Sequence, residues 1–194
     1  MNTQKQEAKG EVLSFKPTFS TVPLKHRSTC PSAHYLNQYI NSNEDFSEIR
    51  KNLVVNGVCK SEERAQELLL AWVQWFSVGA TSVTKSFVML AGPIDRTFHE
   101  LILNTKWYFR FCSEYTGVYT HHEKLTEQQL SEVCEIKSAV EETLQRLEKA
   151  FGNDLHPELK KWVRSAKKGT VTAKSVSCLG NNGPFDIIPR KSSN

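Results

Sequence analysis

Cysteine is scarce and scattered in this sequence, and no long apolar run is present. The five cysteines of the 194-residue chain stand at positions 30, 59, 112, 134 and 178, without a C-x-x-C pair. An odd, widely spaced set argues against a disulfide framework or a zinc ribbon, so reduced thiols are expected. The longest uncharged run, residues 68–84, contains glutamine, glycine, serine and threonine. Because a spanning helix needs about 20 mostly apolar residues, we expect no membrane span but a buried helix that ends near Gly79.

Several catalytic signatures are also missing. The chain has no G-x-S-x-G, no P-loop and no G-x-G-x-x-G, which argues against serine-hydrolase and nucleotide-binding motifs. It has no H-x-x-x-H or H-E-x-x-H zinc pattern either. The first residues lack the order of a secretory signal peptide, so a cytoplasmic protein is expected.

The charge is modest and gathers at the two ends. The net charge is +4, and residues 1–30 hold five Lys or Arg against two Glu. Proteins that bind nucleic acid usually cluster their cations on a folded face, so nucleic-acid binding is not expected. With 39% hydrophobic and 24% charged residues, the chain reads as soluble and globular.

Helical signals dominate the middle of the chain. We predict an all-α fold, a compact bundle of five or six helices spanning residues 31–168, with a flexible arm at 1–30 and a flexible tail at 169–194. Residues 77–94 mix β-branched residues with glycines and a proline, and we expect a loop or an irregular crossing there. The expected helix boundaries are starts at Asp45, Ser61, Pro93, Glu127 and Pro157, and stops at Gly57, Gly117 and Gly152.

The stretch from Phe98 to Glu123 is the most informative. It holds three of the six histidines, one cysteine and seven aromatic residues. If residues 93–115 form one helix, an aromatic stripe that includes Phe98, Tyr108 and Tyr115 lies on one face. Such a stripe is typical of a hydrophobic core.

Polar residues beside this stripe suggest a metal site. Asp95 and His99 are one helical turn apart, so the carboxylate could orient the imidazole. A turn at Gly117 could bring His121 or His122 back toward the helix, and neighbouring side chains should point apart, so one of the two would face inward. The candidate ligands suit zinc or iron(II). The candidate metal residues are Asp95, His99, His121 and His122, and the candidate supporting residues are Thr105, Tyr108 and Cys112.

The same stretch resembles a known family. Its order of residues is Asp95, Phe98-His99, Ile102-Leu103, Thr105, Tyr108, Phe111-Cys112, Gly117 and His121-His122. This order is similar to the pattern of the glycine-rich domain-containing-protein-like family, although Phe98 stands where that family has tryptophan and the chain has only nine glycines. The resemblance implies a mostly helical domain, and it implies that His99, Cys112 and the two adjacent histidines form a group in space.

Three hypotheses about function follow. The first is a soluble helical interaction module that binds a protein partner through its ends or its helical surface. The alternative is a metal-binding protein or a zinc- or iron-dependent enzyme centred on His99 and His121 or His122, with Asp95 as the orienting carboxylate. The third is that these residues only tie the turn after Gly117 to the aromatic helix through buried hydrogen bonds.

Overall fold

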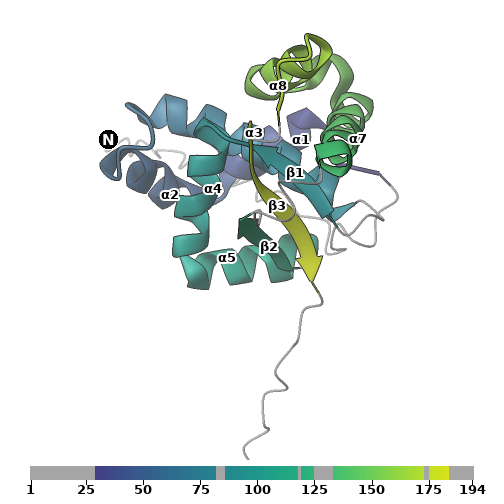
Figure 1. Ribbon diagram of the computed structural model, residues 1–194. Helices are drawn as coiled ribbons and strands as arrows, with labels where there is room; N and C mark the ends of the chain where they lie inside the picture. Colours follow the sequence, from purple (N-terminus) through teal and green to yellow (C-terminus); the bar gives the residue numbers. More distant parts are fainter. Residues whose placement is uncertain (1–28, 82–85, 118, 125–132, 173–174, 184–194) are drawn as a thin grey trace, which may run out of the picture.

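The computed structural model of the chain describes residues 29–81, 86–117, 119–124, 133–172 and 175–183, and Figure 1 shows their arrangement. A π-helical turn, Cys112–Thr116, follows α5, and a 3₁₀ turn, Gly152–Asp154, follows α7. The helices are α1 (Ala33–Ser42), α2 (Glu44–Val55), α3 (Glu62–Ala80), α4 (Pro93–Leu103), α5 (Thr105–Phe111), α7 (Val133–Phe151) and α8 (Pro157–Lys167), and the strands are β1 (Ser86–Leu90), β2 (Tyr119–Lys124) and β3 (Val176–Gly183).

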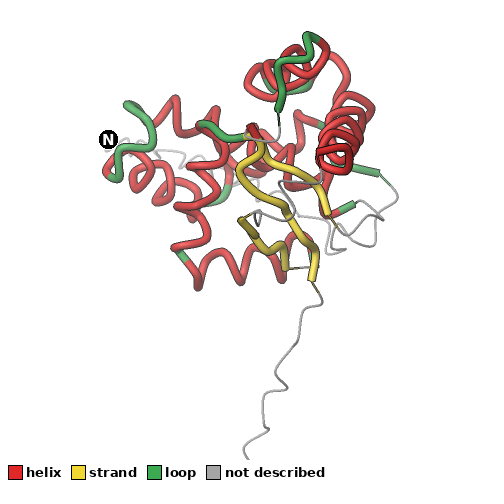
Figure 2. Tube along the Cα trace, in the orientation of Figure 1, coloured by secondary structure: helices red, strands yellow, loops and turns green. Residues whose placement is uncertain are grey.

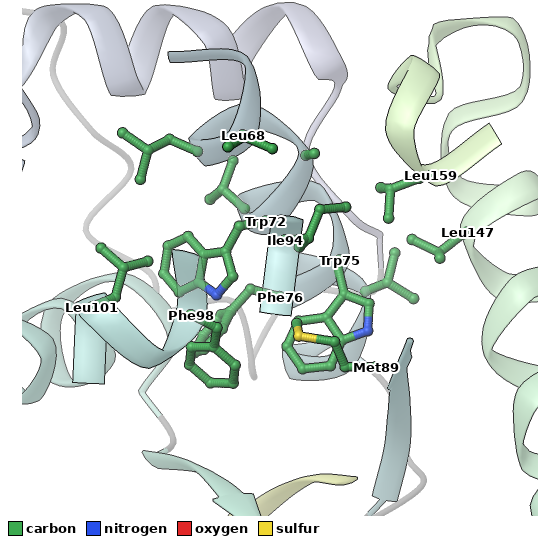
Figure 3. Close-up of a cluster of buried hydrophobic side chains, with 14 of the residues drawn as sticks. Leu68, Trp72, Trp75, Phe76, Met89, Ile94, Phe98, Leu101, Leu147 and Leu159 are labelled. Carbon is green, nitrogen blue, oxygen red and sulfur yellow. The ribbon is translucent and has the colours of Figure 1, made fainter. Parts of the chain in front are cut away.

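Helix α3 is the centre of the hydrophobic core. The hydroxyl of Ser61 accepts a hydrogen bond from the Arg64 N–H at 3.2 Å, and two glutamates occupy the first turn, as the sequence predicted. From Ala71 to Ala80 every residue of the helix is buried. Figure 3 shows its aromatic side chains between α4 and β1, with Leu147 and Leu159 approaching from α7 and α8. A helix segment that is buried on all sides must be covered on all sides by other elements, as residues 71–80 of α3 are.

The predicted single helix over residues 93–115 is wrong, because the chain breaks at Asn104. This residue has φ −81° and ψ 64°, which ends α4 and starts α5. The break turns the aromatic residues of α5 toward α2 and α3, where Trp107 and Phe111 pack against Phe46 and Trp72. Burial of these rings outweighs the loss of helical hydrogen bonds at one residue. Gly117 then ends the π-helical turn at φ 71°, which favours glycine.

A three-stranded antiparallel sheet lies beside the helices, with strand order β1-β3-β2. The predicted helical class is confirmed, because the fold is mainly helical with seven α-helices in the described part of the chain. The predicted bundle of five or six helices is not confirmed, and the loop predicted within residues 77–94 is wrong where Ser86–Leu90 forms β1. Val176–Gly183, predicted as part of a flexible tail, forms the central strand. This segment becomes a strand because it forms hydrogen bonds with β1 on one side and β2 on the other. No local signal in a segment that contains glycine and asparagine indicated this pairing. Figure 2 shows β3 in yellow between its two neighbours.

The outer edge of β1 is covered by side chains. The backbone N–H of Val88 donates to the Thr143 hydroxyl of α7 at 3.1 Å, and its carbonyl accepts from the Trp75 indole N–H of α3 at 2.8 Å. The N–H and the carbonyl of Val88 lie on the outer edge of an edge strand. Without these two side chains they would be free to pair with a strand of another chain. These two bonds join the sheet to the helical core.

Most predicted boundaries are confirmed. Pro93 and Pro157 begin helices, Gly152 follows the end of α7, and α2 begins and ends as expected, within one or two residues. The predicted start at Glu127 lies outside the described residues, as do residues 1–28 of the predicted N-terminal arm. No helix in the described ranges is long and apolar enough to cross a membrane.

Candidate metal centre

Asp95 supplies the first polar group of the site. Pro93 starts α4 with the backbone already in helical conformation, which places Asp95 in the first turn. The positive end of the helix dipole lies there and favours a carboxylate. The Asp95 side chain is 10% exposed, so the carboxylate lies mostly inside the molecule, facing the sheet.

Strand β2 supplies His122, and helix α5 holds this strand in place. The Tyr108 hydroxyl of α5 donates to the Thr120 carbonyl at 2.5 Å, and Cys112 forms a further hydrogen bond with the Thr120 backbone. Thr120 and His122 lie on the same face of β2, because side chains alternate along a strand. The His122 ring packs on Phe98, with ring centroids 4.7 Å apart. Its position is therefore set by contacts from both α4 and α5.

Strand β3 supplies Cys178, which is not among the predicted site residues. His122 pairs with Gly180 and Lys124 pairs with Cys178, so His122 and Cys178 are diagonal neighbours on one face of the sheet. Cys178 is fully buried and is not part of a disulfide. The sheet register thus brings a residue near the C-terminus next to the histidine.

Three donor atoms converge on one point. The His122 Nε2 lies 3.1 Å from Asp95 Oδ1 and 3.2 Å from Cys178 Sγ, and the latter two atoms are 3.8 Å apart. Ligands of a tetrahedral zinc ion lie about 3.3 Å apart for a nitrogen and an oxygen and about 3.5 Å apart for a pair with sulfur, given the usual bond lengths. The observed distances agree with this to within a few tenths of an ångström. Among the described residues, this set is the one whose donor atoms lie close enough together to hold an ion.

The electrostatics keep the carboxylate ionised and the free thiol protonated. Burial alone would raise the pKa of Asp95, but hydrogen bonds from His122 and Ser177 and the nearby His99 outweigh it and lower the pKa. Burial and then the Asp95 charge raise the pKa of Cys178 to about 12. A divalent cation bound by Asp95 and Cys178 would instead lower the pKa of the Cys178 thiol, because a coordinating thiol loses its proton.

A cysteine nucleophile is a poor description of the same residues. In a Cys-His-Asp triad the histidine uses one nitrogen for the thiol and the other for the carboxylate. Here a single nitrogen, Nε2 of His122, faces both. An activated nucleophile also needs a lowered thiol pKa, whereas that of Cys178 is raised. The shared nitrogen fits metal ligation better than proton relay.

The other predicted site residues lie around or away from this centre. The His99 ring packs at a tilt against the His122 ring with centroids 4.4 Å apart, and its Nδ1 lies 4.0 Å from Asp95 Oδ2, outside the converging set. His121 is exposed and packs on Tyr119, so of the two adjacent histidines one faces inward and the other outward, as predicted. Thr105 is exposed at the start of α5, and Tyr108 and Cys112 support β2 rather than the centre.

An open pocket borders the centre on the His122 side. It has a volume of about 630 Å³ and is lined by His99, Ile102, Leu103, His122 and Ser177. Asp95 and Cys178 do not line it, so they form the buried side of the donor set. Pockets of this size hold small molecules in many proteins.

Comparisons of the chain with protein-family models, with curated proteins and with solved structures give no match. The resemblance of residues 95–122 to the glycine-rich domain-containing-protein-like family therefore stays a prediction. The site itself is defined by its geometry.

Proposed function

We propose that the protein binds a zinc ion through Asp95, His122 and Cys178. The observation that carries this proposal is the convergence of their three donor atoms at mutual distances of 3.1, 3.2 and 3.8 Å. Buried polar groups are costly to desolvate alone, and a shared cation would compensate all three of these groups at once.

The donor types favour zinc over iron. A thiolate, an imidazole and a carboxylate are all ordinary zinc ligands, whereas the common non-haem iron(II) site uses two histidines and one carboxylate. His99 could supply a second imidazole only by turning from its present position, in which it approaches the other oxygen of Asp95. Iron is thus the second choice and zinc the first.

Three protein ligands beside an open pocket are typical of a reactive or ligand-binding zinc site. Structural zinc sites are usually closed by four protein ligands, whereas catalytic sites keep one position for water or substrate. An ion held here would act as a Lewis acid toward an oxygen atom in the pocket. His99 is placed to hydrogen-bond to such an oxygen, since its side chain is 55% exposed next to His122.

The interaction-module hypothesis, with a protein partner in the cytoplasm, stays a prediction. Its support was a well-specified helical core, predicted flexible ends and the lack of a complete catalytic motif, and most of the two ends lies outside the described residues. The family resemblance, itself a prediction, groups His99, Cys112, His121 and His122 in space without assigning them a reaction, so it favours neither proposal. Phe98, at the position where that family has tryptophan, packs on the His122 ring and would help to orient it in either case.

The test is a metal analysis of full-length protein produced without a histidine tag. We expect about one zinc ion per chain. The variant His122→Ala should lose the metal and stay folded by circular dichroism. The matched control is His121→Ala, which removes the neighbouring imidazole on the opposite face of β2 and should keep the zinc.

Two results would overturn the proposal. One is equal metal content in the two variants, and the other is a wild-type protein that stays metal-free after incubation with zinc at neutral pH. About one iron per chain, lost in His122→Ala, would replace zinc by iron at the same residues.

A further inference from the structure

The pocket beside the candidate centre has a polar end and an apolar end. Its polar end is formed by His99, His122 and Ser177, and its apolar end by Ile102 and Leu103. Leu103 is 74% exposed, and with Ile102 it gives the pocket an apolar wall.

Helix α4 sets the order of these groups. Asp95 lies in its first turn, His99 follows one turn later, and Ile102 and Leu103 end the helix. At a rise of about 1.5 Å per residue, Ile102 is roughly 10 Å along the axis from Asp95, with His99 about midway. A ligand that reaches the ion with one end would therefore place its other end against the apolar residues.

We propose that this pocket binds a carboxylate with a short apolar tail, one oxygen on the zinc ion and the tail against Ile102 and Leu103. The inference rests on the proposed zinc site and specifies what that site binds. Asp95, His122 and Cys178 provide three ligands, so a tetrahedral ion accepts one further atom from the pocket side.

A carboxylate matches the polar end better than a group with one oxygen does. One oxygen coordinates the ion, and the other accepts a hydrogen bond from a ring N–H of His99. An alcohol would fill the coordination position but offer His99 no second acceptor. The hydroxyl of Ser177 is already engaged by the Met89 carbonyl, at 3.2 Å, and by Asp95, so it is not the donor for this oxygen.

The experiment uses full-length protein with cobalt(II) in place of zinc. The thiolate-to-cobalt charge-transfer band reports the Cys178 ligand, and the d–d bands report the remaining coordination position. Acetate, butyrate and hexanoate are titrated, with hexanol as the neutral comparison. We expect the d–d bands to change with each carboxylate and affinity to rise roughly tenfold for each two added methylenes.

Two variants locate the two ends of the ligand. Leu103→Ser should remove most of the dependence on chain length and leave acetate binding unchanged, because it removes apolar surface without adding a charge that would repel a carboxylate. Val55→Ser, at a largely exposed apolar residue of α2 that does not line the pocket, is the matched control and should behave as wild type. His99→Ala should weaken all three carboxylates about fivefold without changing the charge-transfer band.

The outcomes separate this inference from the zinc proposal. A normal charge-transfer band with d–d bands that hexanoate leaves unchanged would overturn the ligand inference and keep the metal site. Hexanol binding as tightly as hexanoate, or a large loss of cobalt affinity in His99→Ala, would also overturn it, the latter because His99 would then be the fourth ligand. Absence of the charge-transfer band would overturn both proposals.

Discussion

Two tryptophans on neighbouring turns of α3 are equally buried but differ in hydrogen bonding. The indole N–H of Trp75 donates to the Val88 carbonyl of β1 at 2.8 Å. The indole N–H of Trp72 is buried without a hydrogen-bond partner in the described part of the chain. Trp72 lies instead among the rings of Phe76, Phe98 and Phe111. One indole connects helix to sheet, and the other only fills space.

We therefore expect Trp75→Phe to destabilise the protein more than Trp72→Phe does. Both changes remove similar volume from the core, but only the first leaves a buried carbonyl unpaired, which costs about 1–2 kcal/mol more. Urea unfolding of both variants, followed by circular dichroism, measures the difference. Equal loss of stability would show that the bond to β1 contributes nothing measurable.

At the scale of elements, β2 depends on α5 for its position. The buried Tyr108 hydroxyl anchors the Thr120 carbonyl, two residues before His122. A second buried tyrosine, Tyr115, has its hydroxyl within hydrogen-bonding distance of Ser77 on α3, at 3.2 Å, away from β2. The two tyrosines allow stability and metal binding to be separated.

Tyr108→Phe should weaken zinc binding about three- to tenfold, because His122 would be held less firmly. Tyr115→Phe should cost a similar free energy of unfolding, about 1–2 kcal/mol, and leave zinc affinity unchanged. Competition with a chromogenic chelator measures the affinities. If both variants lowered zinc affinity alike, general loss of stability would explain the effect, and Tyr108 would have no positioning role.

The start of α8 carries a pH-sensitive contact. His156 caps this helix, its Nδ1 accepting the Glu158 N–H at 3.2 Å. Burial lowers the pKa of His156, and Arg64 and Lys161 lower it further against the opposing effect of Glu67 and Glu158. Protonation would also remove the acceptor from the cap.

Because the folded-state pKa lies below 6.5, the unfolded chain binds the proton first. Stability should therefore be highest above pH 6.5 and fall as the pH drops from 6.5 toward the folded-state pKa. His156→Asn keeps a capping side chain but does not titrate, so its stability should fall less over the same range. Urea midpoints from pH 7.5 to 5, measured with a chelator present, give the comparison. Parallel curves would rule out His156 as the titrating group.

At the scale of the whole molecule, the candidate centre joins segments that are far apart in the sequence. Its ligands come from α4, β2 and β3, and 83 residues separate Asp95 from Cys178. A shared ion would link α4 of the helical core to β2 and to the first residues of β3 (Figure 1). Binding to the folded state alone then stabilises all of these contacts together.

Zinc should accordingly raise the unfolding midpoint. At a free zinc concentration about 100 times the dissociation constant, the gain is about 2.7 kcal/mol, less any binding to the unfolded chain. Urea unfolding with zinc and with chelator measures the gain. Cys178→Ser should unfold at nearly the same urea concentration with zinc and with chelator. Cys59→Ser is the control, because Cys59 is not one of the three ligands, and it should show the same gain in stability as the wild type. An equal gain in Cys178→Ser would mean that zinc binds elsewhere.

Parts of the centre were predictable from local patterns. Pro93 and Asp95 at a helix start, a turn at Gly117 and two adjacent histidines on opposite faces all follow from short-range rules, and the structure has each of them. The inward histidine could not be chosen in advance, because the choice depends on the register of β2. Cys178 gave no local signal, since an isolated cysteine in a glycine-containing segment is unremarkable until its pairing is known.

By itself the sequence determined that the chain is mainly helical and where α2, α3, α4 and α8 begin, because capping, proline placement and apolar period act within a few residues. It also determined the aromatic core, with Phe98, Tyr108 and Tyr115 buried as predicted. Only the tertiary structure decided the break at Asn104, the strand at Val176–Gly183 and the meeting of Asp95, His122 and Cys178. These features depend on contacts between residues that are far apart in the sequence, and local sequence patterns do not reveal how stabilising such contacts are.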